Sequence, residues 1–133
     1  MFSFLKRKKQ AVVTQTEVES LTAEDVEKIS ESIQKIQTEI LNIPDSNRKK
    51  LAEAYERLGV LQGEIAIDQS IESLEKSMSF QASIGPAYKT LMRLYNQKRS
   101  EAAHKGEGEE IEKWLGKMDQ LRQIARNNTI NSN

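Results

Sequence analysis

LAEAYERLGVLQGEIAIDQSIESLEKSMSF, residues 51–80, is the stretch that decides the fold of this chain. Its apolar residues recur three or four positions apart in two runs, which is the spacing of one face of an α-helix. The two runs comprise Leu51, Ala54, Tyr55, Leu58 and Leu61, then Ile67, Ile71, Leu74 and Met78. Charged residues fall between them, as on the solvent side of an amphipathic helix. The stretch therefore predicts two antiparallel helices that share an apolar seam.

Small residues interrupt both apolar runs. Gly59 lies inside the first predicted helix, where a glycine costs about 1 kcal/mol relative to alanine. Ser70 and Ser77 lie in the second predicted helix. Residues of this size let two backbones approach closely, so we expect Gly59 to mark a contact where the neighbouring helix needs the room.

The segment before this hairpin predicts one more helix. Thr22 and Asp25 have the spacing of a capping box at its start. Pro44 ends it, because the residue before a proline disfavours helical backbone, and we expect Asp45 or Ser46 to cap the next helix. One narrow apolar stripe runs along this first helix, formed by Val26, Ile29, Ile33, Ile36 and Ile40. The stripe has two interpretations: it packs on the hairpin as a cap, or it mediates dimerisation.

The segment after the hairpin predicts a second, longer pair of helices. Pro86 is suited to a first helical position, and the turn of this pair falls at 106–108. We expect an all-α fold of five helices, near 22–42, 46–63, 67–82, 86–105 and 109–126, with no strand. The expected organisation is a disordered N-terminal segment at 1–20, a helical domain at 21–127 and a disordered tail at 128–133.

The composition excludes several classes of function. The chain has 133 residues and no cysteine, so disulfides, thiol catalysis and cysteine-ligated zinc are absent. His104 is the only histidine, and no nucleotide-binding or hydrolase motif is present. A formal net charge of zero argues against nucleic-acid binding, which needs a basic face. We therefore expect no enzymatic activity, no cofactor and no metal.

The central hairpin resembles the tetratricopeptide repeat (TPR) family. The family places an aromatic residue, then Leu-Gly one turn later, in its first helix, and small, aliphatic, bulky and small residues in its second. The matching residues are Tyr55, Leu58, Gly59, Ser70, Ile71, Leu74 and Ser77. The chain departs from the pattern at Ala66, where the family has a Gly-Asp turn, and at Ala82, where it has proline. The resemblance, to small bacterial-type TPR proteins, extends over roughly the last two thirds of the chain.

The resemblance implies a short solenoid of stacked helical hairpins with a peptide-binding groove. In this family the first helix of each pair lines the groove, which binds extended or helical peptides. The groove-facing positions of the family fall on Glu53, Glu56, Val60 and Glu64 in one helix and on Lys89, Arg93, Asn96 and Gln97 in the other. An acidic rim beside a basic one favours a mixed-charge ligand. The implied function is a non-enzymatic adaptor or scaffold that binds a protein or peptide partner.

The N-terminal stretch MFSFLKRKK has two interpretations. Its apolar residues precede its cations, which is the reverse of a signal peptide. In one interpretation it touches an anionic membrane, with aromatic rings below the headgroups and cations above. The contact residues would then be Phe2, Phe4, Leu5, Lys6, Arg7, Lys8 and Lys9. In the other interpretation, these residues form a solvated, disordered N-terminal segment. The expected location is cytoplasmic, at the inner membrane face in the first interpretation.

A second class of function competes with the adaptor. The chain would then be a helical-bundle protein with a structural or self-assembly role, and the stripe from Ile29 to Ile40 would form its dimer interface. The adaptor predicts a monomer in solution, and the assembly protein predicts a stable homodimer.

Overall fold

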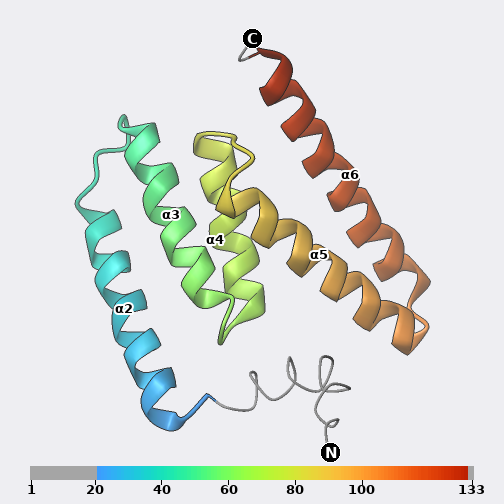
Figure 1. Ribbon diagram of the computed structural model, residues 1–133, viewed down its shortest axis with the longest axis horizontal. Helices are drawn as coiled ribbons and strands as arrows, with labels where there is room; N and C mark the ends of the chain where they lie inside the picture. The colour runs from blue at the N-terminus through green and yellow to red at the C-terminus, as the bar shows by residue number, and fades with distance from the viewer. Residues whose placement is uncertain (1–20, 132–133) are drawn as a thin grey trace, which may run out of the picture. The chain divides into compact units, whose positions relative to one another are not determined.

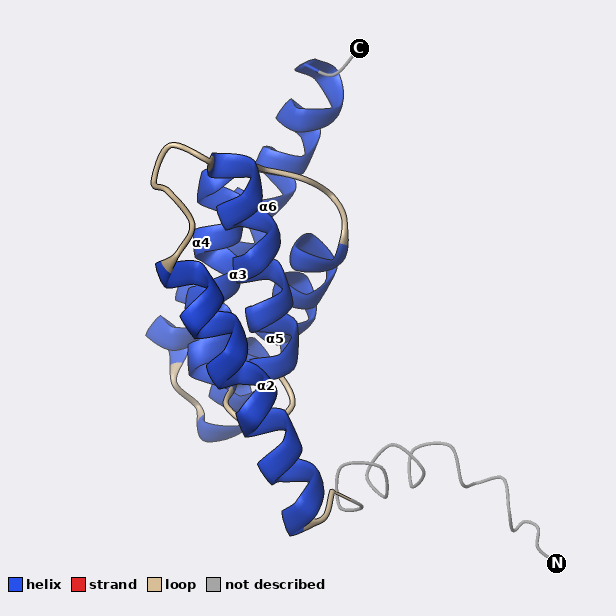
Figure 2. Cartoon of the chain, turned by 90° about the vertical axis from the view of Figure 1, so that its left-hand side faces the viewer, coloured by secondary structure: helices blue, strands red, loops and turns tan. Residues whose placement is uncertain are grey.

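The computed structural model of the chain describes residues 21–131 (Figure 1). Within this range the regular structure consists of five helices without a strand, as Figure 2 shows by colour. They are α2 (Ala23–Leu41), α3 (Arg48–Gln62), α4 (Ile67–Phe80), α5 (Pro86–Lys105) and α6 (Gly108–Asn131). This confirms the expected all-α class. Residues 1–20 and 132–133, and with them the expected membrane contact of residues 1–9, lie outside the described residues.

The chain divides into two compact units, residues 1–31 and residues 32–133. In the first unit, α2 begins with the expected capping box. The backbone N–H of Thr22 donates to Asp25 Oδ2 at 3.1 Å, and the N–H of Asp25 donates to Thr22 Oγ1 at 3.0 Å. These bonds satisfy two donors that the start of a helix leaves without a partner. None of the described helices is long and apolar enough to cross a bilayer.

Helix α3 begins at Arg48, two residues later than expected. Its N-cap is Asn47, whose side-chain oxygen accepts a hydrogen bond from the backbone N–H of Lys50 at 3.2 Å. The expected caps, Asp45 and Ser46, lie instead in a turn closed by the bond from Asn47 N–H to Pro44 O at 2.9 Å. The turn after Pro44 therefore shifts the cap, and asparagine serves as well as serine or aspartate there.

The close contact between α3 and α4 occurs where Gly59 predicted it. A Cβ added to Gly59 would lie 2.4 Å from Leu74 Cγ and 3.2 Å from the backbone N of Leu74. The Ser70 hydroxyl donates to Gly59 O at 2.6 Å, and the Ser77 hydroxyl donates to Ala52 O at 2.7 Å. The small residues thus let the helices approach, and the serines satisfy their own buried hydroxyls on the backbone of α3.

Each helix of the second unit packs on the next. Helix α3 contacts α4, α4 contacts α5, α5 contacts α6, and α3 also contacts α5 (Figure 1). The main core lies among α4, α5 and α6 and comprises Ile71, Leu74, Met78, Ala87, Leu91, Leu94, Tyr95, Trp114, Met118 and Leu121. The second pair has helices of 20 and 24 residues joined at Gly106, a left-handed C-cap. The expected two long helices, without an inserted loop, are therefore confirmed.

Helix α6 extends five residues beyond its expected end at Arg126. It reaches Asn131, so residues 128–131 are helical and are not part of a disordered tail. The Asn128 side chain donates to the backbone oxygen of Ala82 at 2.9 Å. This bond holds the last turns of α6 to the segment that follows α4, which a local sequence pattern does not reveal.

Two glycine substitutions test the close contact between α3 and α4. Gly59→Ala should lower the free energy of unfolding by roughly 1–3 kcal/mol, because the added methyl overlaps Leu74. Gly116→Ala is the matched control, since Gly116 is exposed in α6 and its added Cβ meets no neighbouring atom within 4 Å. This control should gain up to about 1 kcal/mol from helix propensity. Urea unfolding followed by circular dichroism measures the free energy of unfolding of both variants. An equal gain in stability for Gly59→Ala and Gly116→Ala would contradict the close contact at Gly59.

Candidate functional site

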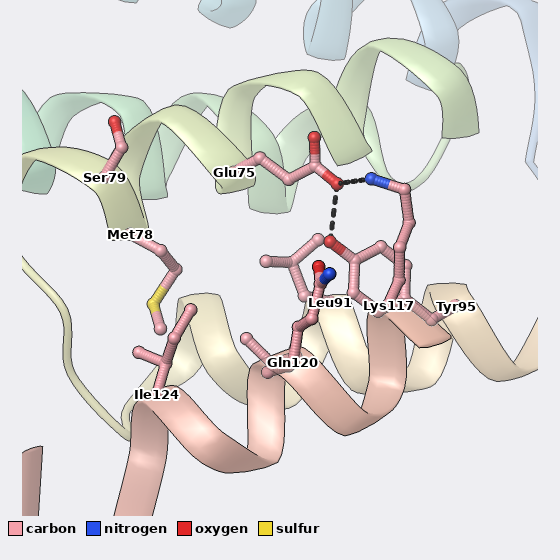
Figure 3. Close-up of a pocket in the computed structure, with 9 residues that line it drawn as sticks. Glu75, Met78, Ser79, Leu91, Tyr95, Lys117, Gln120 and Ile124 are labelled. Carbon is pink, nitrogen blue, oxygen red and sulfur yellow. Dashed lines mark hydrogen bonds and ion pairs between the residues drawn. The ribbon is translucent and has the colours of Figure 1, made fainter. Parts of the chain in front are cut away.

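Helices α4, α5 and α6 surround a pocket of about 220 Å³ (Figure 3). Met78 of α4 and Ile124 of α6 face each other across it, and Leu91 of α5 lies beside Tyr95. A polar group closes one end, formed by Glu75, Tyr95, and Lys117. The pocket is therefore an apolar recess with a charged end, built from three helices.

The polar end is a cluster that takes one residue from each helix. Glu75 Oε2 accepts a hydrogen bond from the Tyr95 hydroxyl at 2.5 Å and another from Lys117 Nζ at 2.9 Å. Lys117 Nζ also lies 5.7 Å from the centre of the Tyr95 ring, close enough for a cation–π contact. The Tyr95 ring also packs against Trp114, with ring centres 5.8 Å apart. The cluster fixes the spacing of the three helices at this end.

The electrostatics of the cluster keep the Tyr95 hydroxyl protonated. Burial raises the pKa of the Tyr95 hydroxyl far above its usual value, and the hydrogen bond to Glu75 raises it further. Tyr95 therefore stays neutral and acts as a donor. Lys117 balances the charge of Glu75 at 2.9 Å. The pocket volume of about 220 Å³ lies below the ~300–1,000 Å³ of common small-molecule sites.

Within residues 21–131, histidine, aspartate and glutamate form no group of three that could hold a metal ion. His104 lies near the end of α5, where its Nδ1 is 2.9 Å from the backbone oxygen of Ser100 in the preceding turn. This histidine is exposed and its contact is local to its own helix.

Most of the predicted partner-binding residues lie on exposed parts of α3 and α5. Glu53, Val60 and Glu64 are exposed on or just after α3, and Lys89, Arg93 and Asn96 are exposed on α5. Gln97 is half-buried and donates to Glu101 at 3.4 Å. The two sets belong to helices that contact each other.

Glu56 has a structural role that the sequence did not predict. Its Oε2 accepts the backbone N–H of Ala87 in the first turn of α5 at 2.8 Å. The N-cap of α5 is Gly85, which has no side chain to accept such a bond. Glu56 of α3 therefore caps α5 from another helix. It is half-buried, and this bond ties together the two helices that bear the predicted groove residues.

The cluster of Glu75, Tyr95 and Lys117 was missed because its members are far apart in sequence. Glu75 lies 20 residues before Tyr95 and 42 residues before Lys117. The helical pattern assigns Tyr95 to the core and leaves the other two as ordinary surface charges.

No family model, curated protein or solved structure matches the chain.

Substitution of Tyr95 by phenylalanine tests the cluster through the pH dependence of stability. Near pH 8, Tyr95→Phe should lower the free energy of unfolding by about 1.5–3 kcal/mol, the net contribution of one hydrogen bond to a charged group. The folded-state pKa of Tyr95 is raised, so its contribution is present below the unfolded-state pKa of about 10 and is lost at higher pH. The parent should therefore lose its advantage over the variant above about pH 10.

Urea unfolding at pH 8 and above pH 10 measures this difference. Tyr88→Phe is the control, because the Tyr88 hydroxyl makes no hydrogen bond to the described residues and its removal should change stability little at pH 8. A stability difference between the parent and Tyr95→Phe that is the same at both pH values would show that the Tyr95 hydroxyl titrates alike in the folded and unfolded chain.

Proposed function

We propose that this protein is a non-enzymatic adaptor that binds a peptide or partner helix on a TPR-like stack of helical hairpins. The observation that carries the proposal is the order of packing. Helix α5 begins the second pair and contacts both helices of the first pair, α3 and α4. Stacked hairpins of a solenoid pack in this way and leave the first helix of each pair on one surface. The close contact at Gly59 supports the same resemblance.

The charges on α3 and α5 support a partner of mixed charge. Glu53 and Glu64 are exposed on or just after α3, and Lys89 and Arg93 are exposed one turn apart on α5. None of these four side chains forms an ion pair with another described residue. In the proposed complex, acidic residues of the partner face α5 and basic residues face α3, which sets orientation and association rate.

Self-assembly through the isoleucine stripe is the alternative. Within the second unit, Ile36 is buried, with 7% of its surface exposed, while Ile33 and Ile40 are half-buried. The burial of Ile36 favours packing of this part of the stripe within the chain. Light scattering of the purified protein measures its mass in solution and so distinguishes a monomer from a dimer. The adaptor proposal expects a monomer, and a stable dimer that dissociates on Ile33→Asp substitution would favour self-assembly.

Charge reversal on α5 tests the binding surface. The double substitution Lys89→Glu and Arg93→Glu should leave stability within about 0.5 kcal/mol of the parent, because both side chains are exposed. It should weaken capture of an acidic partner, because it reverses two charges that face the ligand. A pull-down from the source cell, with a thermal melt of each protein, measures both effects.

The control for this experiment is the pair Lys35→Glu and Arg126→Glu. It makes the same change of net charge at exposed positions on α2 and α6. Loss of partners with the α5 variant, but not with the control, supports the proposal. Equal recovery of partners by an α5 variant as stable as the parent would exclude this surface from the binding site.

A further inference from the structure

A second hollow lies between the end of α2 and the α3–α4 hairpin, and its volume is about 480 Å³. Helix α3 contributes Tyr55, Leu58 and Gln62 to its wall. With 3.6 residues per turn, these residues lie on the side of α3 opposite to Glu53 and Val60. The hollow is therefore separate from the surface proposed above, and all the residues that line it belong to the second unit.

Gln62 is the buried polar residue of this hollow, with 3% of its surface exposed. Its Oε1 accepts a hydrogen bond from the Ser73 hydroxyl at 2.5 Å. This length lies at the short end of the range of O–H···O bonds and below the range of N–H···O bonds, in keeping with the amide oxygen facing Ser73. Its other end, Nε2, donates to no described residue. A buried amide nitrogen without an acceptor is unfavourable, and an acceptor from a ligand would satisfy it.

Carboxamides from three helices line the hollow. They are Gln37 of α2, Gln62 of α3 and Gln69 of α4. A carboxamide offers the same donor and acceptor groups as a peptide bond. Among the lining residues, Glu72 and Lys76 contribute one charge of each sign, so the wall has no net charge. The hollow therefore matches an uncharged ligand that is rich in amide groups.

The apolar part of the hollow lies beside these amides. Leu58 is buried, Ile40 is half-buried, and Tyr55 is held under Lys76, whose Nζ lies 5.4 Å from the ring centre. The volume falls in the range of about 300–1,000 Å³ that ligand sites occupy. It can therefore take one aliphatic side chain together with the peptide groups that flank it.

We propose that this hollow binds an extended, uncharged peptide segment of a partner protein. A main-chain carbonyl of that segment accepts a hydrogen bond from Gln62 Nε2, and an aliphatic side chain beside it packs on Leu58 and Ile40. Gln37 and Gln69 pair with the neighbouring peptide groups. The site goes beyond the proposed adaptor surface, since it uses the other side of α3 and requires no charge on the ligand.

Titration of the full chain with N-acetyl-leucine methylamide tests the proposal. This probe carries a leucine side chain between two peptide groups. Nuclear magnetic resonance should show a saturable shift of the Gln62 side-chain NH₂ signals. 2-Methylbutane, which has the branched apolar chain and no hydrogen-bonding group, should bind roughly three- to ten-fold more weakly, as expected for the loss of one hydrogen bond. Binding of both probes with equal affinity would overturn the proposal, as would the absence of a saturable shift.

Gln62→Met removes the amide and keeps the size of the side chain. It should weaken binding of the leucine probe by roughly three- to ten-fold and leave the affinity for 2-methylbutane unchanged. Gln123→Met, at an exposed position of α6, is the matched control and should change neither affinity. If a thermal melt shows that Gln62→Met does not fold, Gln69→Met replaces it as the test variant, because Gln69 is exposed and its substitution should not disturb the core. Unchanged affinity for the leucine probe in the folded variant would overturn the proposal.

Discussion

The close approach of α3 and α4 at Gly59 is the contact on which the rest of the second unit depends. Leu74 occupies the space that a side chain at position 59 would need. The same leucine is completely buried and belongs to the core that α4 shares with α5 and α6. A change in the spacing of the first hairpin would therefore move the residue on which α5 packs. One glycine thus couples the first pair of helices to the second.

Two glutamates then fix the later helices. Glu56 of α3 caps the start of α5, and Glu75 of α4 accepts hydrogen bonds from Tyr95 of α5 and Lys117 of α6. Both carboxylates join helices that are distant in sequence, and both are only partly exposed. Because these bonds set where α5 lies against α3 and α4, they also set the geometry of the surface that α3 and α5 are proposed to present to a partner.

The sequence predicted the features that depend on local pattern. The five helices, the capping box at Thr22 and the crowded glycine at position 59 each follow from residues within one or two helical turns of each other. The features it missed depend on tertiary contacts. Asn128 prolongs α6 by bonding to Ala82, 46 residues earlier. The amide of Gln62 falls among polar residues of an amphipathic helix, and only packing shows that it is buried.

Native-state amide hydrogen exchange tests the central role of the first hairpin most directly. The backbone amides of Gly59 and Leu74 lie at the seam of α3 and α4, within the helices that hold the unit together. Their opening free energies should equal the global free energy of unfolding measured with denaturant, and they should be the last amides to exchange. Exchange at Gly59 and Leu74 that is faster than exchange at Leu121 of α6 would show that α3 and α4 separate while α5 and α6 stay folded. That result would contradict the dependence of the second pair on the first.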